Sequence, residues 1–190
     1  QEAVDLFKPR IFNIGHDEVT GSGRFPYRSQ SSGKTITQLI IDDINIYHDW
    51  FTQRGIKVML WGDMFLHQTE ATDAHNAESP AEAKARRAGL PRDVIIADWH
   101  YGFAEPEDFI SLKLWKDEGL AAIGAGWDSP DNIRNLAKAC DIYGAFGYLQ
   151  TTWAGFNFAI TGNEPAWRQY WSYILAAYYS WSGDTAPDDK

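Results

Sequence analysis

The chain reads Phe12-Asn13-Ile14-Gly15-His16-Asp17-Glu18-Val19 near its start, and this stretch decides the fold. A short apolar run, Ile11 to Ile14, is typical of a β-strand, and two acidic side chains follow it almost directly. Acidic neighbours are common at the start of a helix, because they complement the helix dipole. At the end of a strand they occupy the position where α/β enzymes place catalytic groups. Asp17 and Glu18 are therefore candidate catalytic residues.

Strand and helix signals alternate along the rest of the chain. Apolar runs predict four further strands, at Lys57 to Leu60, Val94 to Ala97, Ala121 to Ile123 and Phe146 to Leu149. Glycine supplies the left-handed cap of a helix, and it ends a helical pattern before each run, at Gly55, Gly89, Gly119 and Gly144. Proline opens helical patterns at Pro80, Pro106, Pro130 and Pro165. Near-continuous apolar strands are typical of a parallel sheet covered on both faces.

The repeated strand–helix units restrict the fold to two architectures. With right-handed crossovers they form either an open doubly wound sheet or a (β/α)8 barrel. No Gly-rich phosphate loop follows a strand, which disfavours the nucleotide-binding doubly wound fold. A closed barrel needs eight strands, so we expect an α/β chain that forms a partial (β/α)8 TIM-type barrel of about five units. The expected catalytic domain spans residues 1–183, and residues 184–190 form a polar tail.

Other features support a barrel fragment with a packed core. The segment Glu2 to Phe7 is expected to be the tail of a helix leading into the first strand, as if the chain began inside a barrel. Cys140 is the only cysteine and lies in an apolar helical stripe, so a small core residue is expected there. Two further stripes at helical spacing are expected to face the core: Ile40, Ile44, Tyr47 and Phe51 on one helix, and Trp167, Trp171, Ile174, Leu175 and Tyr178 on the last.

Composition excludes some partners and favours others. A net charge of −9 argues against nucleic acid and against an anionic membrane surface. Aromatic residues make up 15% of the chain, with 9 Trp, and many follow strands, which suits the C–H face of a sugar ring. No cofactor or metal is expected. No apolar run reaches membrane-spanning length and no signal peptide is visible, but Gln1 is not an initiator residue, so the cellular compartment stays open.

Residues suited to a sugar site follow every expected strand. In order along the chain they are His16, Asp17, Glu18, Trp61, Asp63, Trp99, Tyr101, Trp127 and Trp153. If the units curl as a barrel does, these residues converge on one rim. A carboxyl group among indole rings loses hydration, which raises its pKa as a general acid requires. Glu18 is the candidate acid.

The stretch from Phe12 to Val19 resembles the His/Asn-x-Gly-x-Asp-Glu signature of family 20 glycoside hydrolases, the β-N-acetylhexosaminidases. The resemblance implies that the five strands are the fourth to eighth of a (β/α)8 barrel. It also implies substrate-assisted catalysis with retention, in which the sugar's 2-acetamido oxygen attacks the anomeric carbon. Glu18 would protonate the departing oxygen and then activate water, while Asp17 would orient the acetamido N–H and stabilise the oxazolinium-like intermediate.

The same resemblance assigns roles to the aromatic residues and names the expected partners. Trp61, Trp99 and Trp153 would wall the sugar pocket, and Tyr101 would offer its hydroxyl to the acetamido oxygen. The expected ligands are glycans that contain N-acetylhexosamine. Gly126-Trp127-Asp128 stands where the family has Tyr-Leu-Asp, no Glu lies two places after Trp153, and three strands of the barrel are missing. The missing N-terminal half-barrel, or a second copy of the chain, is therefore an expected partner, because a half-barrel leaves sheet edges exposed.

Four alternatives remain open at this point. In the first, Asp17 and Glu18 merely cap the following segment while the Trp residues pack in the core. A metal enzyme would use His16, Asp17, Asp63, Asp98 and His100 as ligands. A retaining β-glycosidase would pair Glu18 with Asp98 or Asp128 as nucleophile, the carboxyls about 5 to 5.5 Å apart. A non-catalytic half-barrel would bind carbohydrate or mediate assembly.

Overall fold

The computed structural model describes residues 1–19, 33–153 and 164–182, with no side chains for residues 164–167. The expected tail at residues 184–190 and the side chain of Trp167 lie outside this description. None of the described helices combines the length and the apolar character needed to cross a membrane.

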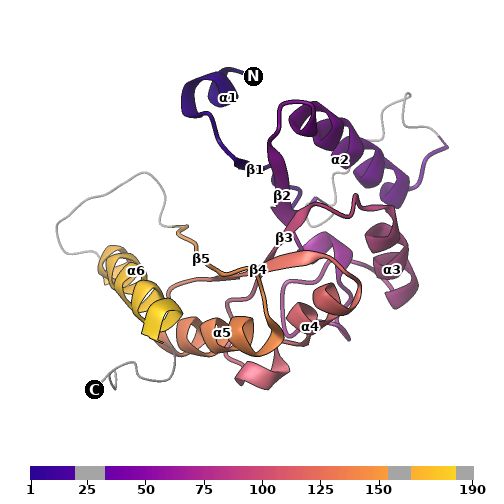
Figure 1. The fold of residues 1–190 in the computed structure, drawn as a ribbon. Helices are drawn as coiled ribbons and strands as arrows, with labels where there is room; N and C mark the ends of the chain where they lie inside the picture. The colour runs from indigo at the N-terminus through magenta and orange to yellow at the C-terminus, as the bar shows by residue number, and fades with distance from the viewer. Residues whose placement is uncertain (20–32, 154–163, 183–190) are drawn as a thin grey trace.

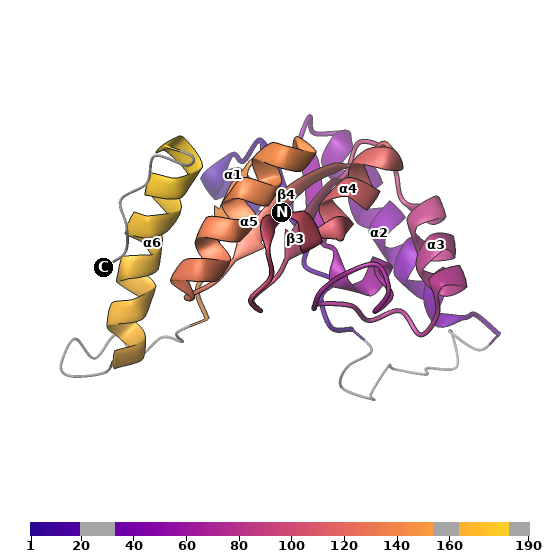
Figure 2. The ribbon, with the colours of Figure 1, turned by 90° about the horizontal axis from the view of Figure 1, so that it is seen from below.

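One parallel sheet forms the centre of the molecule. Its five strands are β1 (Ile11–Asn13), β2 (Lys57–Trp61), β3 (Ile95–Trp99), β4 (Ala121–Gly126) and β5 (Tyr148–Gln150). They lie in sequence order, and each pairs in parallel with the next. The sheet is curled, so that the elements form an arch (Figures 1 and 2). The α/β class and the five parallel strands predicted from the sequence are confirmed, with strand ends shifted by one to three residues.

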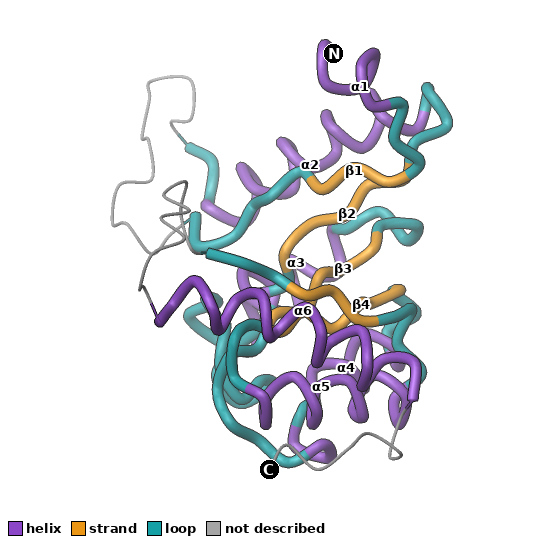
Figure 3. Tube along the Cα trace, turned by 90° about the vertical axis from the view of Figure 1, so that its left-hand side faces the viewer, coloured by secondary structure: helices purple, strands orange, loops and turns teal. Residues whose placement is uncertain are grey.

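One helix precedes the first strand, and the helices that follow the strands cover the outer side of the arch. The helices are α1 (Glu2–Phe7), α2 (Ile36–Thr52), α3 (Pro80–Gly89), α4 (Ile110–Asp117), α5 (Pro130–Tyr143) and α6 (Glu164–Ser182), with short 3-10 turns η2 (Asp63–Phe65) and η3 (Pro106–Asp108). Local signals set the starts: Thr35 and Gln38 form a capping box before α2, and Ser79 caps α3 ahead of Pro80. Figure 3 shows α1 beside the β1 edge, with α5 and α6 at the opposite end.

The core lies between the sheet and its helices. Ile44, Leu60, Ile96, Trp115 and Leu136 are fully buried there. A smaller cluster joins α6 to α5 through Ile133, Ala137, Ala176 and Tyr179. Cys140 is buried in the main core as expected, and burial raises the pKa of its thiol to about 12.

Three of the four expected glycine caps are confirmed. Gly55, Gly119 and Gly144 have φ angles of 69°, 74° and 68°, which is the left-handed region. Gly89 is different, because its φ is not positive and α3 runs directly into an extended Leu90. A Cβ at Gly89 would lie 2.9 Å from Cγ2 of Ile41, so this glycine allows α3 to pack closely against α2.

The predicted core face of the last helix was wrong at its described side chains except Leu175, which is half-buried and packs against the cluster that joins α6 to α5. Trp171 and Ile174 are 55% and 59% exposed, and Tyr178 is also exposed. The helix instead buries Ala176 and Tyr179, because the face that carries the small side chain fits against α5. The stripe on α2 is confirmed for Ile40, Ile44 and Phe51, whereas Tyr47 is exposed and lies edge-on to His16.

Candidate active site

A pocket of about 280 Å³ lies at the carboxyl ends of the strands. We call it the tryptophan pocket; it is lined by Asp17, Glu18, Trp61, Trp99, Tyr101, Trp127 and Trp153. All five strands contribute, since the lining residues lie at or just after the end of each strand. The structure thus brings together every predicted site residue except His16 and Asp63.

The turn after β1 has an unusual backbone. Gly15, His16 and Glu18 have φ angles of 78°, 71° and 49°, and positive values are costly for residues with a Cβ. Hydrogen bonds hold the turn from several sides. Asn13 Oδ1 accepts from Gly15 N at 2.8 Å, and the Gly15 carbonyl accepts from Trp61 N at 3.0 Å. Backbone strain held in place in this way is common at functional sites.

His16 anchors this turn and does not line the pocket. Its Nε2 lies 2.8 Å from Asp43 Oδ2 on α2, and its Nδ1 lies 3.1 Å from the Ile14 carbonyl. The ring also meets Tyr47 edge-on, with centroids 6.1 Å apart. The imidazole therefore ties the β1 turn to α2.

Asp63 lies beneath the pocket and positions two of its residues. The side chain is 1% exposed, and its carboxylate accepts from Glu18 N at 2.9 Å and from Trp99 Nε1 at 3.0 Å. Asn76 Nδ2 donates to the same group at 2.7 Å. Burial raises the pKa of Asp63, and these hydrogen bonds oppose the increase. Sequence reasoning missed Asn76, which lies in a long polar loop with no local motif.

The aromatic walls of the pocket are joined to one another. Tyr101 packs against Trp99 and Trp127, with ring centroids 4.9 Å and 5.5 Å away, and Trp61 lies 6.1 Å from Trp153. Trp153 Nε1 donates to the Tyr101 hydroxyl at 2.8 Å. An indole N–H is only a donor, so the phenol oxygen accepts there and its own proton serves another partner. Burial raises the pKa of Tyr101.

A buried charged network supports the Tyr101 segment from behind. His100 is fully buried, its Nδ1 pairs with Asp73, and its Nε2 lies 2.8 Å from Ser111 Oγ. Ser111 in turn donates to Asp98 Oδ2 at 2.7 Å. Asp73 also accepts from the backbone N–H groups of Tyr101 and Gly102, both at 2.8 Å.

The charges of this network stabilise one another. Burial lowers the pKa of His100, but the carboxylates of Asp98 and Asp73 outweigh that effect and raise it to about 9. Burial raises the pKa of Asp73, but the hydrogen bond and the charge of His100 outweigh it and lower the pKa to about 2. At neutral pH His100 is thus a cation held between two carboxylates. Sequence reasoning missed Asp73 and Ser111, because neither lies in a recognisable motif.

The alternative chemistries fit this geometry less well. Among the described residues, no group of three or more His, Cys, Asp or Glu side chains is arranged to hold a metal ion. Asp98 is buried and bonded to Ser111, and Asp128 lies 3.8 Å from Arg168 Nε. Neither carboxylate is among the described residues that line the tryptophan pocket, where a nucleophile for a retaining glycosidase would have to lie.

The two candidate catalytic carboxylates are more accessible than the sequence suggested. Asp17 and Glu18 are both exposed, although indole rings line the same pocket. The reason is their place in the sheet: β1 is an edge strand, and in the described part of the chain it pairs only with β2. The loss of hydration predicted for Glu18 is therefore not present in this structure.

No model of a known protein family matches the chain, and no curated protein matches it either. The chemistry of the tryptophan pocket therefore has to be inferred from its own residues.

Proposed function

We propose that this chain carries the catalytic site of a β-N-acetylhexosaminidase-type glycoside hydrolase and supplies strands 4 to 8 of a (β/α)8 barrel. One observation carries the proposal: two adjacent carboxylates and five aromatic rings, from five separate strand ends, line a single pocket. A pocket at the carboxyl ends of parallel strands is where barrel enzymes bind substrate. Its volume of about 280 Å³ is near the lower end of the usual range for ligand sites, which suits a single terminal sugar.

The lining suits a sugar that bears an acetamido group. The rings of Trp61, Trp99, Trp127 and Trp153 offer apolar faces for the C–H side of a pyranose and for a methyl group. Asp17 and Glu18 supply hydrogen-bond acceptors at one end of the pocket. The pocket therefore combines the apolar and polar surfaces that an N-acetylhexosamine presents.

The proposed reaction uses the substrate's own acetamido group as nucleophile. Its oxygen bonds to the anomeric carbon while the bond from that carbon to the departing oxygen breaks, and Glu18 delivers a proton to that oxygen. Asp17 accepts the acetamido N–H and stabilises the positive charge of the cyclic intermediate. Water then attacks the anomeric carbon while the bond from that carbon to the acetamido oxygen breaks, Glu18 takes a proton from the water, and the sugar leaves with its acetamido group restored and its configuration retained.

Neighbouring groups place these residues for the reaction. The Asp63 carboxylate holds the Glu18 backbone N–H and the Trp99 indole together, so the acid and one wall of the pocket share a support. The Tyr101 hydroxyl accepts from Trp153, which leaves its own proton for the acetamido oxygen. Preorganised donors of this kind stabilise charge that develops in the transition state.

The same proposal requires cover for the open edges of the sheet. In the described residues β1 and β5 each pair with one neighbour only, and unpaired parallel edges are rarely left open to water. Exposed apolar side chains flank both edges, Leu6 and Phe7 on α1 and Trp171 and Ile174 on α6. Further βα units, from another polypeptide segment or from a second copy of this chain, would cover them. Sedimentation velocity distinguishes a self-paired chain from one that needs a different partner.

A chromogenic assay tests the proposal. The substrates are the nitrophenyl β-glycoside of N-acetylglucosamine and the matching β-glucoside, which has a hydroxyl in place of the acetamido group. Turnover of the acetamido substrate alone, lost in Glu18→Gln, is the expected result. Equal turnover of both substrates, or full activity in Glu18→Gln, would contradict substrate-assisted hydrolysis at this pocket.

Glycan binding without turnover is a second candidate function. The exposure of Asp17 and Glu18 favours it, because a carboxyl group that keeps its hydration is a weaker match to the needs of a general acid. Binding of N-acetylhexosamine oligomers with no product release, in a protein whose sheet edges are covered, would select this second function.

A further inference from the structure

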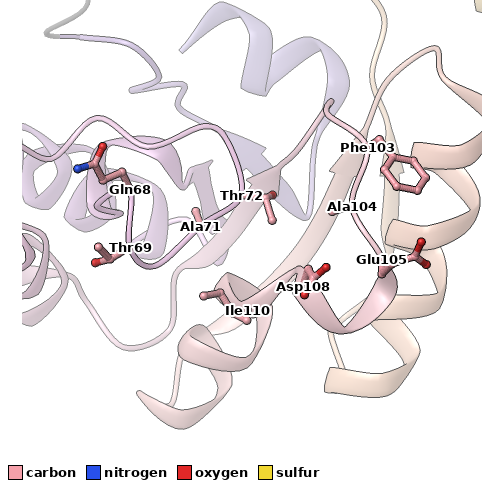
Figure 4. Close-up of a pocket in the computed structure, with 9 residues that line it drawn as sticks. All are labelled: Gln68, Thr69, Ala71, Thr72, Phe103, Ala104, Glu105, Asp108 and Ile110. Atoms are coloured by element: carbon pink, nitrogen blue, oxygen red, sulfur yellow. The ribbon is translucent and has the colours of Figure 1, made fainter.

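A second hollow lies at the loops after β2 and β3, and among the described residues it shares no lining residue with the tryptophan pocket. This hollow, here called the lateral groove, has a volume of about 450 Å³ and separates the loop after β2 from the loop after β3 (Figure 4). It is lined by Gln68, Thr69, Ala71, Thr72, Phe103, Ala104, Glu105, Asp108 and Ile110. Figure 4 shows Gln68, Thr69 and Thr72 on one loop and Phe103 and Glu105 on the facing one.

The two walls of the lateral groove are fixed relative to each other. Asp73, next to Thr72 in the first loop, accepts two backbone N–H groups from the second loop and pairs with the buried His100. The second loop is also held from α5, where Asn132 Nδ2 donates to the Gly102 carbonyl at 2.9 Å and Asn135 Nδ2 donates to the Ala104 carbonyl at 2.9 Å. The hollow is therefore preformed, so binding would cost little ordering of the protein.

The lining combines an exposed ring with uncompensated negative charge. Phe103 is 67% exposed, so its ring is accessible to a ligand. Glu105 and Asp108 are exposed acids, and within the described residues neither carboxylate has a hydrogen-bond or ion-pair partner. Among the described residues, the lining contains no Lys, Arg or His. The groove is thus a fixed anionic hollow with an aromatic face and with the amide of Gln68.

We propose that the lateral groove binds a hexosamine unit whose amino group is free and protonated, as in a partly deacetylated glycan. The ammonium group would lie between Glu105 and Asp108, where a neutral sugar would leave two charges without a counterion. The C–H face of the ring would pack on Phe103, whose electron-rich face also attracts a cation. Gln68 would accept from, or donate to, ring hydroxyls.

This inference rests on the proposed function only for the class of glycan. Tyr101 lines the tryptophan pocket and Phe103 lines the groove, and their Cα atoms are at most about 7 Å apart because two residues span no more than that. The proposal places neighbouring units of one glycan in the two hollows. The groove would then select glycans that carry an unacetylated unit near the N-acetylated sugar that is cleaved.

Titration of the isotopically labelled protein with a β-1,4-linked glucosamine dimer, followed by NMR, tests the proposal. The expected result is a saturable shift of the Phe103 and Ala104 resonances that the di-N-acetylated dimer does not reproduce. Glu105→Gln and Asp108→Asn should each weaken binding about two- to fivefold, and Phe103→Ala about two- to tenfold. Glu107→Gln is the matched control, because Glu107 is an exposed neighbour that does not line the groove.

Two further arms of the experiment make the result decisive. Trp61→Ala, which removes a wall of the tryptophan pocket, should leave dimer binding at the groove unchanged, so failure of the proposed hydrolase function does not affect this test. Free lysine is the competitor that carries an ammonium group without a sugar ring. Equal binding of lysine and the dimer, equal binding of the two dimers, or an equal loss in Glu107→Gln would overturn the proposal.

Discussion

Acidic residues lie at the ends of both β1 and β3, but the two sets differ in burial and in hydrogen bonding. At the end of β3, Asp98 is buried and its partners Ser111 and His100 are buried with it. After β1, Asp17 and Glu18 are exposed, and in the described part of the chain neither carboxylate accepts a hydrogen bond. Acids whose partners are all inside the protein stabilise the fold, whereas acids that face a pocket without partners are available to a substrate. The comparison therefore separates structural carboxylates from candidate functional ones.

The largest expected effect is on turnover at the β1 end. Glu18→Gln keeps the size of the side chain but removes the proton that a general acid delivers, so kcat on the acetamido substrate should fall about 10²- to 10⁴-fold. Because Glu18 is exposed, the free energy of unfolding should stay within about 0.5 kcal/mol of the native value. Steady-state kinetics and urea unfolding measure the two quantities. A large loss of stability in this variant would contradict the claim that the acids after β1 do not stabilise the fold.

Substitutions at the β3 end should instead lower the free energy of unfolding. His100→Ala leaves the buried carboxylate of Asp98 without its cation, and breaking a buried ion pair in this way typically costs about 3 to 5 kcal/mol. Urea unfolding followed by Trp fluorescence gives the loss. The exposed pair of Lys113 and Asp117 provides a control, since Lys113→Ala should change stability by less than about 1 kcal/mol. Similar losses in the two variants would contradict the structural role of His100.

The pH dependence of the free energy of unfolding should also depend on His100. The pKa of His100 is raised to about 9 in the folded chain and is about 6.5 when unfolded, so its contribution is complete below about pH 6.5 and is lost as the pH rises through 9. The total loss approaches about 3 kcal/mol. Asp73, with a pKa lowered to about 2, adds stability that disappears as the pH falls below about 4. His100→Ala should flatten the alkaline limb of a stability–pH curve, and an unchanged limb would refute the assignment.

The smallest expected effect is a gain in stability at the β1 end. Glu18 has a φ of 49°, a region that costs a residue with a Cβ about 1 to 2 kcal/mol and costs glycine nothing. Glu18→Gly should therefore keep or raise the thermal unfolding midpoint while it abolishes turnover. Val19→Gly has no such strain to relieve and should lower the midpoint. A marked loss of stability in Glu18→Gly would show that the turn after β1 is held by the glutamate side chain itself.

Much of the fold followed from local signals in the sequence. The five strands were predictable because each is a short apolar run with a polar or aromatic end, and a glycine precedes the four later runs. These features act within a few residues. Pro80 and Pro130 marked helix starts for the same local reason. The buried face of α6 was not predictable, since this helix carries large apolar side chains on several faces. Only its contact with Ile133 and Ala137 of α5 selects the face that is buried.

The residues of the candidate site also differ in whether the local sequence predicts their position. Asp17, Glu18 and four Trp residues were found because they directly follow strands, and strand ends meet at one rim. The positions of His16 and Asp63 depend on partners far away in the sequence, Asp43 for one and Trp99 for the other. Asp73 and Asn76 lie in a loop without a motif, so only the folded chain shows that they support the pocket.

The most direct test of the tryptophan pocket is the binding of a stable bicyclic analogue of the cyclised acetamido intermediate, measured by calorimetry. The proposed mechanism predicts that it binds at least about 100-fold more tightly than N-acetylglucosamine, since a site complementary to the reaction's charged intermediate prefers its mimic. Asp17→Asn should remove most of this gain, whereas Glu107→Gln should retain it. An analogue that binds no more tightly than the parent sugar, or a gain that survives Asp17→Asn, would contradict substrate-assisted catalysis by this chain.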